Sequence, residues 1–300
     1  MIALLDALLA QTPAADVSGP APLNIVQTII LGIVQGLTEF LPISSSAHLK
    51  VVPIALGWGD PGVAYTAIIQ LGSIVAVLWY FRKDLTSITF GAVDAVVRRD
   101  YESQEFKMAL GIALGTIPIV FLGLLIKILV PDFDKSPLRS LASIAIASIV
   151  MSLLLAIAEK VGKRDRTYEK LTVQDGILMG LGQAMALIPG CSRSGSTLTA
   201  GLFMGLERGA AARFSFLLGI PAITLAGLVE LKSVLGEGIG DAGVVTLGVG
   251  TISAFIFSYL SIAWLMKFLQ TQNTWVFVWY RLAFGVAILT AILGGALKNS

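Results

Sequence analysis

The amino-acid sequence predicts an all-α polytopic membrane protein with an inverted-topology repeat. Of its 300 residues, 56% are hydrophobic and only 13% are charged, and the mean hydropathy is +0.85. A soluble domain carries about 25% charged residues. Long uncharged runs recur along the chain, and about 20 apolar residues suffice to cross the hydrocarbon core of a bilayer. We therefore expect six transmembrane helices and two re-entrant helix–loop–helix hairpins.

The first residues are expected to stand apart from this membrane domain. Residues 1–22 are slightly acidic and lack the basic start of a signal peptide, so they are interpreted as an N-terminal extension. Residues 23–300 are expected to form a single membrane domain, in which repeat one covers about 24–160 and repeat two about 173–297.

Each repeat is expected to begin with a re-entrant hairpin. In the first, an apolar run ends at Leu41-Pro42, three serines follow, and a short apolar run continues to Leu56. The second has the same layout around Pro189-Gly190 and ends near Leu206. The halves are too short to cross a bilayer comfortably, and irregular backbone at membrane depth needs protein or a water-filled cavity around it. The alternative, an ordinary span with a kinked end, leaves the polar middles unexplained.

Three ordinary spans are expected after each hairpin. They cover 62–81, 106–130 and 138–159 in the first repeat, and 210–231, 243–267 and 275–297 in the second. Several short matches recur at an offset of 147 residues: Pro42 with Pro189, Ser45 with Ser192, and Leu71-Gly72 with Leu218-Gly219. Because a unit with three crossings ends on the opposite side of the membrane, the second copy is expected to be inverted.

Basic residues predict the orientation of the chain. Lysine and arginine concentrate in the connections 82–107, 160–172, 207–213 and 267–274, which are expected to be cytoplasmic loops by the positive-inside rule. Both termini and the opening of the first hairpin then face outward. Charged residues near span ends are expected to extend to the interface, as long side chains do; these are Lys127, Glu159, Glu230 and Arg281. No basic run indicates a nucleic-acid partner.

The tip of the first hairpin carries groups suited to catalysis. Gln35 and Glu39 are four residues apart and share one helix face. Glu39 is a candidate metal ligand or general base. His48, the only histidine, is a candidate nucleophile or proton donor. Three hydroxyls lie between them, on Ser44, Ser45 and Ser46.

The tip of the second hairpin carries groups suited to binding an anion. Arg193 is permanently charged and shaped for bidentate contact with phosphate. It lies at an expected helix start, where free amides favour an anion. Small polar residues surround it: Ser192, Ser194, Gly195, Ser196 and Thr197. Since ionisable groups at bilayer depth are expensive and usually mark a site, the two tips together predict a membrane enzyme for a phosphorylated substrate.

Two motifs resemble the signatures of the bacitracin-resistance undecaprenyl-diphosphate phosphatases. The first is Gln35-Gly-Leu-Thr-Glu39-Phe-Leu-Pro-Ile-Ser-Ser-Ser-Ala-His48, which matches (Glu/Gln)-x-x-x-Glu followed by Pro-x-Ser-Ser-x-x-His. The second is Pro189-Gly-x-Ser-Arg193-Ser-Gly-x-Thr197. The resemblance runs from about residue 24 to the C-terminus, and the two motifs at this separation are highly specific.

The resemblance implies a multi-pass protein of the bacterial plasma (inner) membrane with an outward-facing site. The implied reaction is hydrolysis of undecaprenyl diphosphate to the monophosphate carrier used in peptidoglycan synthesis, which confers bacitracin resistance. It also implies a divalent cation, Mg²⁺ or Ca²⁺. The implied catalytic residues are Glu39, His48, Ser45 and Arg193. Gln35 stands where the family often has glutamate, so a metal site on Glu39 and Gln35 would have one carboxylate.

Several alternatives stay open at this point. Ser45 or His48 could be the nucleophile, with Glu39 assisting, or His48 could protonate the leaving phosphate. Whether the chain forms a homodimer is not determined by its sequence. The competing class is an inverted-repeat transporter or flippase for an anionic lipid, because broken helices and a polar site at mid-membrane are common to both classes.

Overall fold

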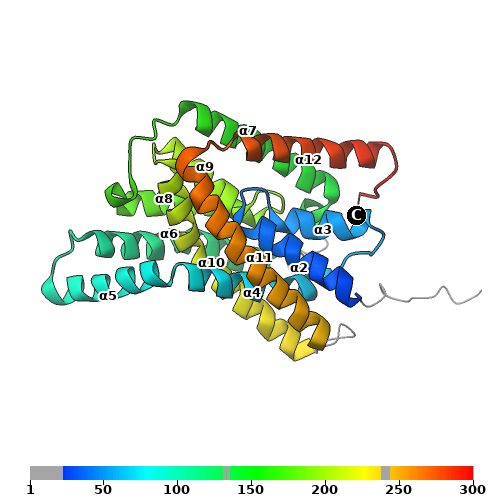
Figure 1. Cartoon of the computed structure of the whole chain (residues 1–300), viewed down its shortest axis with the longest axis horizontal. Coiled ribbons are helices and arrows are strands. Elements are labelled where there is room, and N and C mark those ends of the chain that lie inside the picture. Colours follow the sequence, from blue (N-terminus) through cyan, green and yellow to red (C-terminus); the bar gives the residue numbers. More distant parts are fainter. Residues whose placement is uncertain (1–22, 131–132, 134–135, 238–243, 300) are drawn as a thin grey trace, which may run out of the picture.

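The computed structural model describes residues 23–130, 133, 136–237 and 244–299, and these contain eleven α-helices and no named β-strand. The predicted all-α class is confirmed (Figure 1). The predicted N-terminal extension, residues 1–22, lies outside the described residues.

The helices follow one another in two series. The first series is α2 (Ile25–Phe40), α3 (Ser45–Ala55), α4 (Gly62–Tyr80), α5 (Arg82–Arg98), α6 (Gln104–Leu129) and α7 (Leu141–Val161). The second is α8 (Val173–Ala184), α9 (Arg193–Phe203), α10 (Arg208–Glu237), α11 (Val244–Thr271) and α12 (Trp275–Leu293). Short 3₁₀ turns occupy Pro137–Arg139, Tyr168–Lys170 and Met185–Leu187.

Five of the described helices are long and apolar enough to cross a membrane: α6, α7, α10, α11 and α12. The number is six if α4 and α5, which are bent by 65° at their junction, form one span. These helices fall where the sequence predicts ordinary spans. The protein is therefore multi-pass by the length and composition of its helices.

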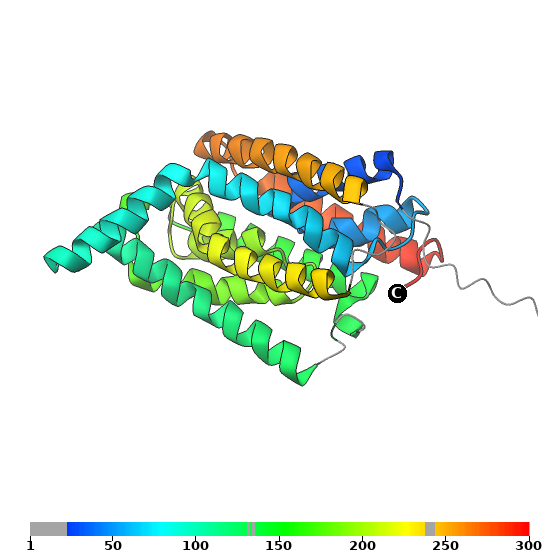
Figure 2. The same cartoon turned by 90° about the horizontal axis from the view of Figure 1, so that it is seen from below.

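Helices from the two series pack against each other through small residues. The chief pairs are α11 with α2 and α4, α6 with α8, and α12 with α7 (Figures 1 and 2). A Cβ on Gly180 of α8 would lie 2.1 Å from the carbonyl oxygen of Gly115 on α6, so this crossing requires glycine. Such close approach of backbones is typical of helix packing in membranes, where small residues provide the contact area.

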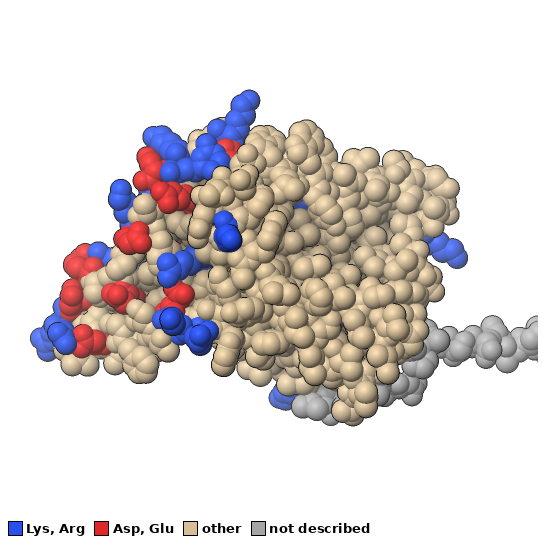
Figure 3. Space-filling view, viewed as in Figure 1, with Lys and Arg blue, Asp and Glu red and all other residues tan. Residues whose placement is uncertain are grey.

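Charged residues gather at one end of the molecule, where α5 lies, and the rest of the visible face is almost free of them (Figure 3). Large apolar side chains are exposed on α6, for example Phe121 and Ile128. This separation matches the clustering of basic residues in the sequence, and an apolar outer face is what lipid contact requires.

One prediction about the connections is wrong. Residues 82–107 were expected to form a loop, but Arg82–Arg98 is the helix α5. The segment contains many charged residues and threonines, so its short apolar face is hard to recognise in the sequence. Ile88 and Ala95 form this face and are buried. That face packs on α6, where Gly91 contacts Glu105, so tertiary packing and not an apolar run stabilises this helix.

Candidate active site

Two turns with the same backbone geometry begin α3 and α9. Ser44 (φ 76°, ψ 100°) precedes α3, and Ser192 (φ 69°, ψ 119°) precedes α9. In each turn the serine hydroxyl lies 3.2 Å from that of the serine two residues later, Ser46 or Ser194. A positive φ is strained for a residue with a side chain, and such strain concentrates at functional sites.

This geometry corrects the sequence match between the halves by one residue. Ser192 corresponds to Ser44, not to Ser45, because the second turn has one residue more after its proline. Pro42 is two residues before its serine, whereas Pro189 is three residues before. An alignment of the two turns therefore needs a one-residue gap after the proline, which a constant offset of 147 residues does not allow.

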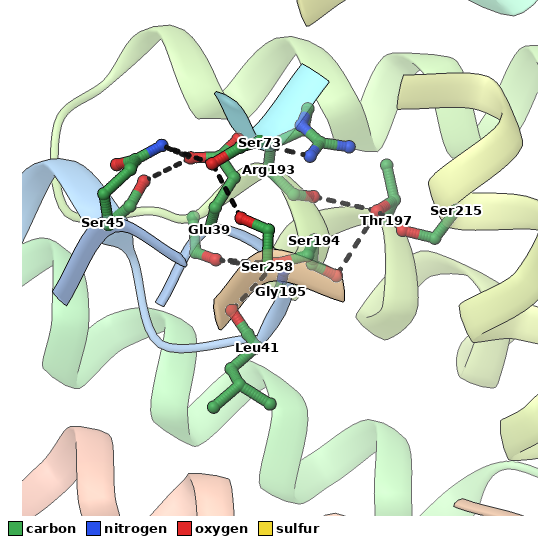
Figure 4. Close-up of polar contacts among 12 residues, drawn as sticks. Glu39, Leu41, Ser45, Ser73, Arg193, Ser194, Gly195, Thr197, Ser215 and Ser258 are labelled. Carbon is green, nitrogen blue, oxygen red and sulfur yellow. Dashed lines mark hydrogen bonds and ion pairs between the residues drawn. The ribbon is translucent and has the colours of Figure 1, made fainter. Parts of the chain in front are cut away.

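The two turns contact each other. The hydroxyl of Ser194 donates to the carbonyl oxygen of Leu41 at 2.9 Å (Figure 4). Nη2 of Arg193 lies 3.4 Å from Oε1 of Glu39. Residues more than 150 positions apart in the sequence thus form one polar cluster.

Glu39 is the centre of this cluster and is buried at the end of α2. Its Oε2 accepts a hydrogen bond from the Ser45 hydroxyl at 2.6 Å and one from Nε2 of Gln35 at 3.3 Å. Nε2 of Gln35 also donates to Ser73 at 3.2 Å, and Ser73 accepts from Ser258 at 2.8 Å (Figure 4). A hydroxyl held on a carboxylate is the arrangement of a nucleophile and its base.

Arg193 is buried with much of its hydrogen-bonding capacity unused. Its side chain is 9% exposed, and Nε and Nη1 have no hydrogen-bond partner among the described residues. Its guanidinium carbon lies 5.9 Å from the ring centre of Phe40. Since an unpaired buried donor costs about 1–3 kcal/mol, this arrangement suits an acceptor that arrives from outside the protein, such as a phosphate oxygen.

A cavity of about 330 Å³ opens beside these groups. Residues of both turns line it, including Glu39, Ser45 and Arg193. Gln35, Ser44, Ser46 and Ser192 also line it, and so do the charged residues Lys50, Asp60 and Arg139. Its volume is within the usual range of sites for small ligands, about 300–1,000 Å³.

His48 is not among the residues that line this cavity, although it contacts Ser44, which does. Its ring stacks on Phe284 with a centroid distance of 4.3 Å, and Nε2 lies 2.6 Å from the Tyr280 hydroxyl. Nδ1 lies 2.7 Å from the carbonyl oxygen of Ser44. Because a carbonyl can only accept, Nδ1 is protonated and donates a hydrogen bond to the carbonyl oxygen of Ser44. In the neutral ring, Nε2 then accepts a hydrogen bond from the Tyr280 hydroxyl. The histidine therefore fixes the first turn.

Three further polar residues of the second turn are engaged within the protein. The Ser194 hydroxyl bonds to Leu41, and the Gly195 amide donates to the Ser192 hydroxyl at 3.2 Å. The Thr197 hydroxyl bonds to Ser215 and donates to the carbonyl of Arg193. These groups maintain the shape of the turn and do not line the cavity.

Arg281 corrects a prediction from the sequence. It was expected to extend to the interface, but it is 1% exposed and lies between the two turns. It donates to the carbonyl oxygens of Pro42 (2.9 Å), Gly190 (2.8 Å) and Cys191 (3.1 Å), and to that of Ser148 on α7 (3.4 Å). One guanidinium thus holds the first and second turns together.

Glu159 corrects the same prediction. It is 3% exposed and accepts hydrogen bonds from Arg208, from Arg164 at 2.8 Å and from the Thr274 hydroxyl at 2.8 Å. Its partners lie on three other segments, so the carboxylate joins α7 to the starts of α10 and α12 instead of reaching solvent.

The fold and this site define a class: a multi-pass helical membrane protein with a serine–carboxylate pair and a buried arginine on one cavity. Comparison with known proteins makes the assignment specific. Residues 28–287 match the family described as bacitracin resistance protein BacA, and the chain belongs to that family.

Curated relatives agree with this assignment. Proteins named undecaprenyl-diphosphatase from Trichormus variabilis and Trichodesmium erythraeum are 68% and 64% identical to it. The matches cover 96% and 93% of this chain and 90% and 89% of those proteins. A third, from Synechococcus elongatus, is 64% identical over 94% of this chain and 98% of its own length.

Proposed function

We infer that this protein is an undecaprenyl-diphosphatase, which hydrolyses undecaprenyl diphosphate to undecaprenyl phosphate and inorganic phosphate. The reaction recycles the lipid carrier for peptidoglycan synthesis and confers bacitracin resistance. Family membership supports this function. The observation that carries it is the Ser45–Glu39 hydrogen bond beside a buried Arg193 with open donors on one cavity.

Ser45 is the proposed nucleophile and Glu39 its general base. The Ser45 oxygen attacks the terminal phosphorus as its proton moves to Glu39, and the bond from phosphorus to the bridging oxygen breaks, which releases the lipid monophosphate. Glu39 passes that proton to the departing lipid phosphate. Water then attacks the phosphoserine as Glu39 accepts one of its protons, and Glu39 returns a proton to the Ser45 oxygen as its bond to phosphorus breaks and inorganic phosphate leaves. The 2.6 Å contact between the two side chains supports this assignment.

Arg193 is the proposed diphosphate ligand, and it stabilises the charge that develops during phosphoryl transfer. Ser44, Ser46 and Ser192 supply further polar contacts from the cavity wall. Ser194, Gly195 and Thr197 act indirectly, because their bonds lie within the protein and keep the second turn in shape. His48 likewise acts through Ser44, which its ring holds in place.

A divalent cation fits this site as a partner of the substrate. No group of three histidine, cysteine, aspartate or glutamate side chains forms a metal site in the described part of the chain. Glu39 and Gln35 offer oxygen ligands, and Mg²⁺ is commonly held by one or two carboxylates plus substrate phosphates. When bound, Mg²⁺ or Ca²⁺ would neutralise charge on the diphosphate oxygens.

We propose that α2–α3 and α8–α9 are re-entrant hairpins of two inverted repeats. The matched turns at Ser44 and Ser192 and the contact between them support this arrangement. The gathering of charged residues at one end supports an orientation with that end in the cytoplasm and with both termini and the site towards the outer, periplasmic side (Figure 3).

Phosphate release by the purified protein in detergent tests the function. Undecaprenyl diphosphate is supplied with Mg²⁺, Ca²⁺ or EDTA, and the exposed Ser87→Ala on α5 serves as the control for Ser45→Ala. Ser45→Ala is expected to lose about 10³-fold or more in rate, as removal of a nucleophile does, and EDTA is expected to stop release. No release by the folded wild type with any cation would favour the transporter alternative.

A further inference from the structure

The guanidinium of Arg193 lies directly against the backbone of α10 at Gly219. A Cβ placed on Gly219 would lie 1.8 Å from Nη1 and 2.8 Å from Cζ of Arg193, whereas ordinary van der Waals contact is 3.4–4 Å. Even alanine at position 219 therefore excludes the arginine from its place. The third nearest atom, at 3.5 Å, also belongs to Arg193.

Two other side chains complete the slot around the guanidinium. The Phe40 ring lies 5.9 Å from its carbon, at a distance that permits a cation–π interaction. Phe40 packs edge-on against Phe216 of α10 at 5.5 Å, which fixes the ring relative to that helix. Glu39 approaches Nη2 at 3.4 Å, a long distance for an ion pair with good hydrogen bonds.

The slot is continuous with the cavity. Ala222, Ile223 and Ala226 line the cavity and follow Gly219 by three, four and seven residues, so all four lie on one face of α10. Arg193 lines the same cavity, and its Nε and Nη1 have no hydrogen-bond partner in the described part of the chain. Gly219 thus lies where the cavity wall meets the arginine.

Gly72, which matches Gly219 at the offset of 147 residues, lies against backbone and not against a side chain. Gly72 lies against the carbonyl oxygen of Thr251, 2.1 Å from a Cβ built there, and close to the amide of Phe255. It allows α4 to approach α11, as small residues do in membrane helices. At Gly219 the nearest atoms belong to a side chain of the proposed site, so helix packing does not explain it.

We propose that Gly219 is a positioning residue for phosphate transfer. Because it has no side chain, the guanidinium of Arg193 fits against α10, close to Glu39 but not in a tight ion pair with it. The guanidinium donors therefore stay available for diphosphate oxygens. The proposal rests on the role inferred above for Arg193. A methyl group at position 219 would displace the guanidinium of Arg193 towards Glu39. A tight ion pair between them would then occupy both the proposed general base and the proposed anion ligand.

A double-mutant cycle tests this role. Gly219→Ala is made in the wild type and in Arg193→Lys, whose side chain has no Nη1 to displace, and phosphate release and its inhibition by inorganic pyrophosphate are measured on full-length protein. In the wild type, Gly219→Ala is expected to lower kcat/KM about 100-fold and pyrophosphate affinity about tenfold, the scale of a small misplacement of a catalytic group. In Arg193→Lys the further loss is expected to stay below about threefold, because the pair is non-additive.

Gly209→Ala is the matched control, since Gly209 is in the same helix and has no neighbour within 4 Å of a built Cβ. It is expected to leave both measurements unchanged. Equal losses from Gly219→Ala in the two backgrounds would overturn the proposal. If Gly219→Ala fails to fold, folding restored by Arg193→Ala supports the slot, and failure in that background also overturns it. A fully active Arg193→Lys with unchanged pyrophosphate affinity would instead refute the role of Arg193 itself.

Discussion

The two turns of the site share one backbone design and differ in chemistry. Each begins a short helix from a serine with positive φ, and each places a hydroxyl pair 3.2 Å apart. The first turn brings Ser45 onto a carboxylate, whereas the second carries Arg193 with free donors. The comparison indicates that two turns of the same geometry supply the proposed nucleophile from one side of the cavity and the proposed anion ligand from the other.

The correspondence extends one helical turn further. His48 donates from Nδ1 to the carbonyl oxygen of Ser44 at 2.7 Å, and the Ser196 hydroxyl donates to that of Ser192 at 2.8 Å. Both donors lie four residues after the serine that begins the helix. By this comparison His48 occupies a structural position, even though it is the only histidine of the chain.

The largest expected effect comes from removing the distinctive charge of each turn. Glu39→Gln and Arg193→Gln are each expected to lower the rate of phosphate release about 10³-fold, because each removes a group that acts in the transition state. The double variant is expected to lose little more than either single variant, since residues that act as a unit are non-additive. Multiplied losses in the double variant would show that the two turns act independently.

Arg281 tests whether the turns must be held together. Arg281→Met would leave buried carbonyl oxygens of both turns unpaired, and a buried polar group left without a partner costs about 1–3 kcal/mol. We expect a large fall in thermal stability in detergent, together with loss of phosphate release. Arg98→Met is the control because Arg98 is exposed on α5, where it pairs with Asp94 across one helical turn. A stable and active Arg281→Met would show that the turns keep their places without this link.

The sequence predicts the parts of the site that depend on local spacing. Five or six apolar spans follow from composition, and the contact between Gln35 and Glu39 follows from their separation by one helical turn. Both polar turns are marked by proline and serine in apolar surroundings. These features need no knowledge of which helices meet.

The features that the sequence misses depend on contacts between distant segments. Arg281 looks like an ordinary residue near a span end, and only the packing of α12 brings it to carbonyls up to 239 positions away. The contacts of the His48 ring with Tyr280 and Phe284 likewise depend on the packing of α12 and have no signal in the sequence. Ser73 and Ser258 are serines within apolar helices, and their signal is the cost of a buried hydroxyl.

Substitution of His48 is expected to have a smaller effect, and it tests whether the first turn can use the same hydrogen bond as the second. His48→Ser would copy the residue found at the matching place of the second turn, where the Ser196 hydroxyl donates to the corresponding carbonyl, that of Ser192. We expect phosphate release to stay within about tenfold of wild type, since a neutral hydrogen bond contributes about 0.5–1.5 kcal/mol. His48→Phe, which keeps the stack but has no donor, is expected to lose more than His48→Ser. Complete loss in His48→Ser, with labile phosphate trapped on the wild-type histidine, would make His48 the nucleophile.

The smallest expected effect is a difference in stability that arises from the helix caps of the two turns. The Ser192 hydroxyl accepts from the Gly195 amide at 3.2 Å, whereas the Ser44 side chain makes no capping bond to α3. Ser192→Ala is therefore expected to destabilise the protein by about 1 kcal/mol, the usual value of a serine cap, and Ser44→Ala by less than about half of that. Both alanine variants keep the positive φ, so backbone strain cancels in the comparison. Thermal unfolding in detergent measures the difference, and equal shifts of Tm would mean that the hydroxyl pairs, and not the cap, govern the stability of these turns.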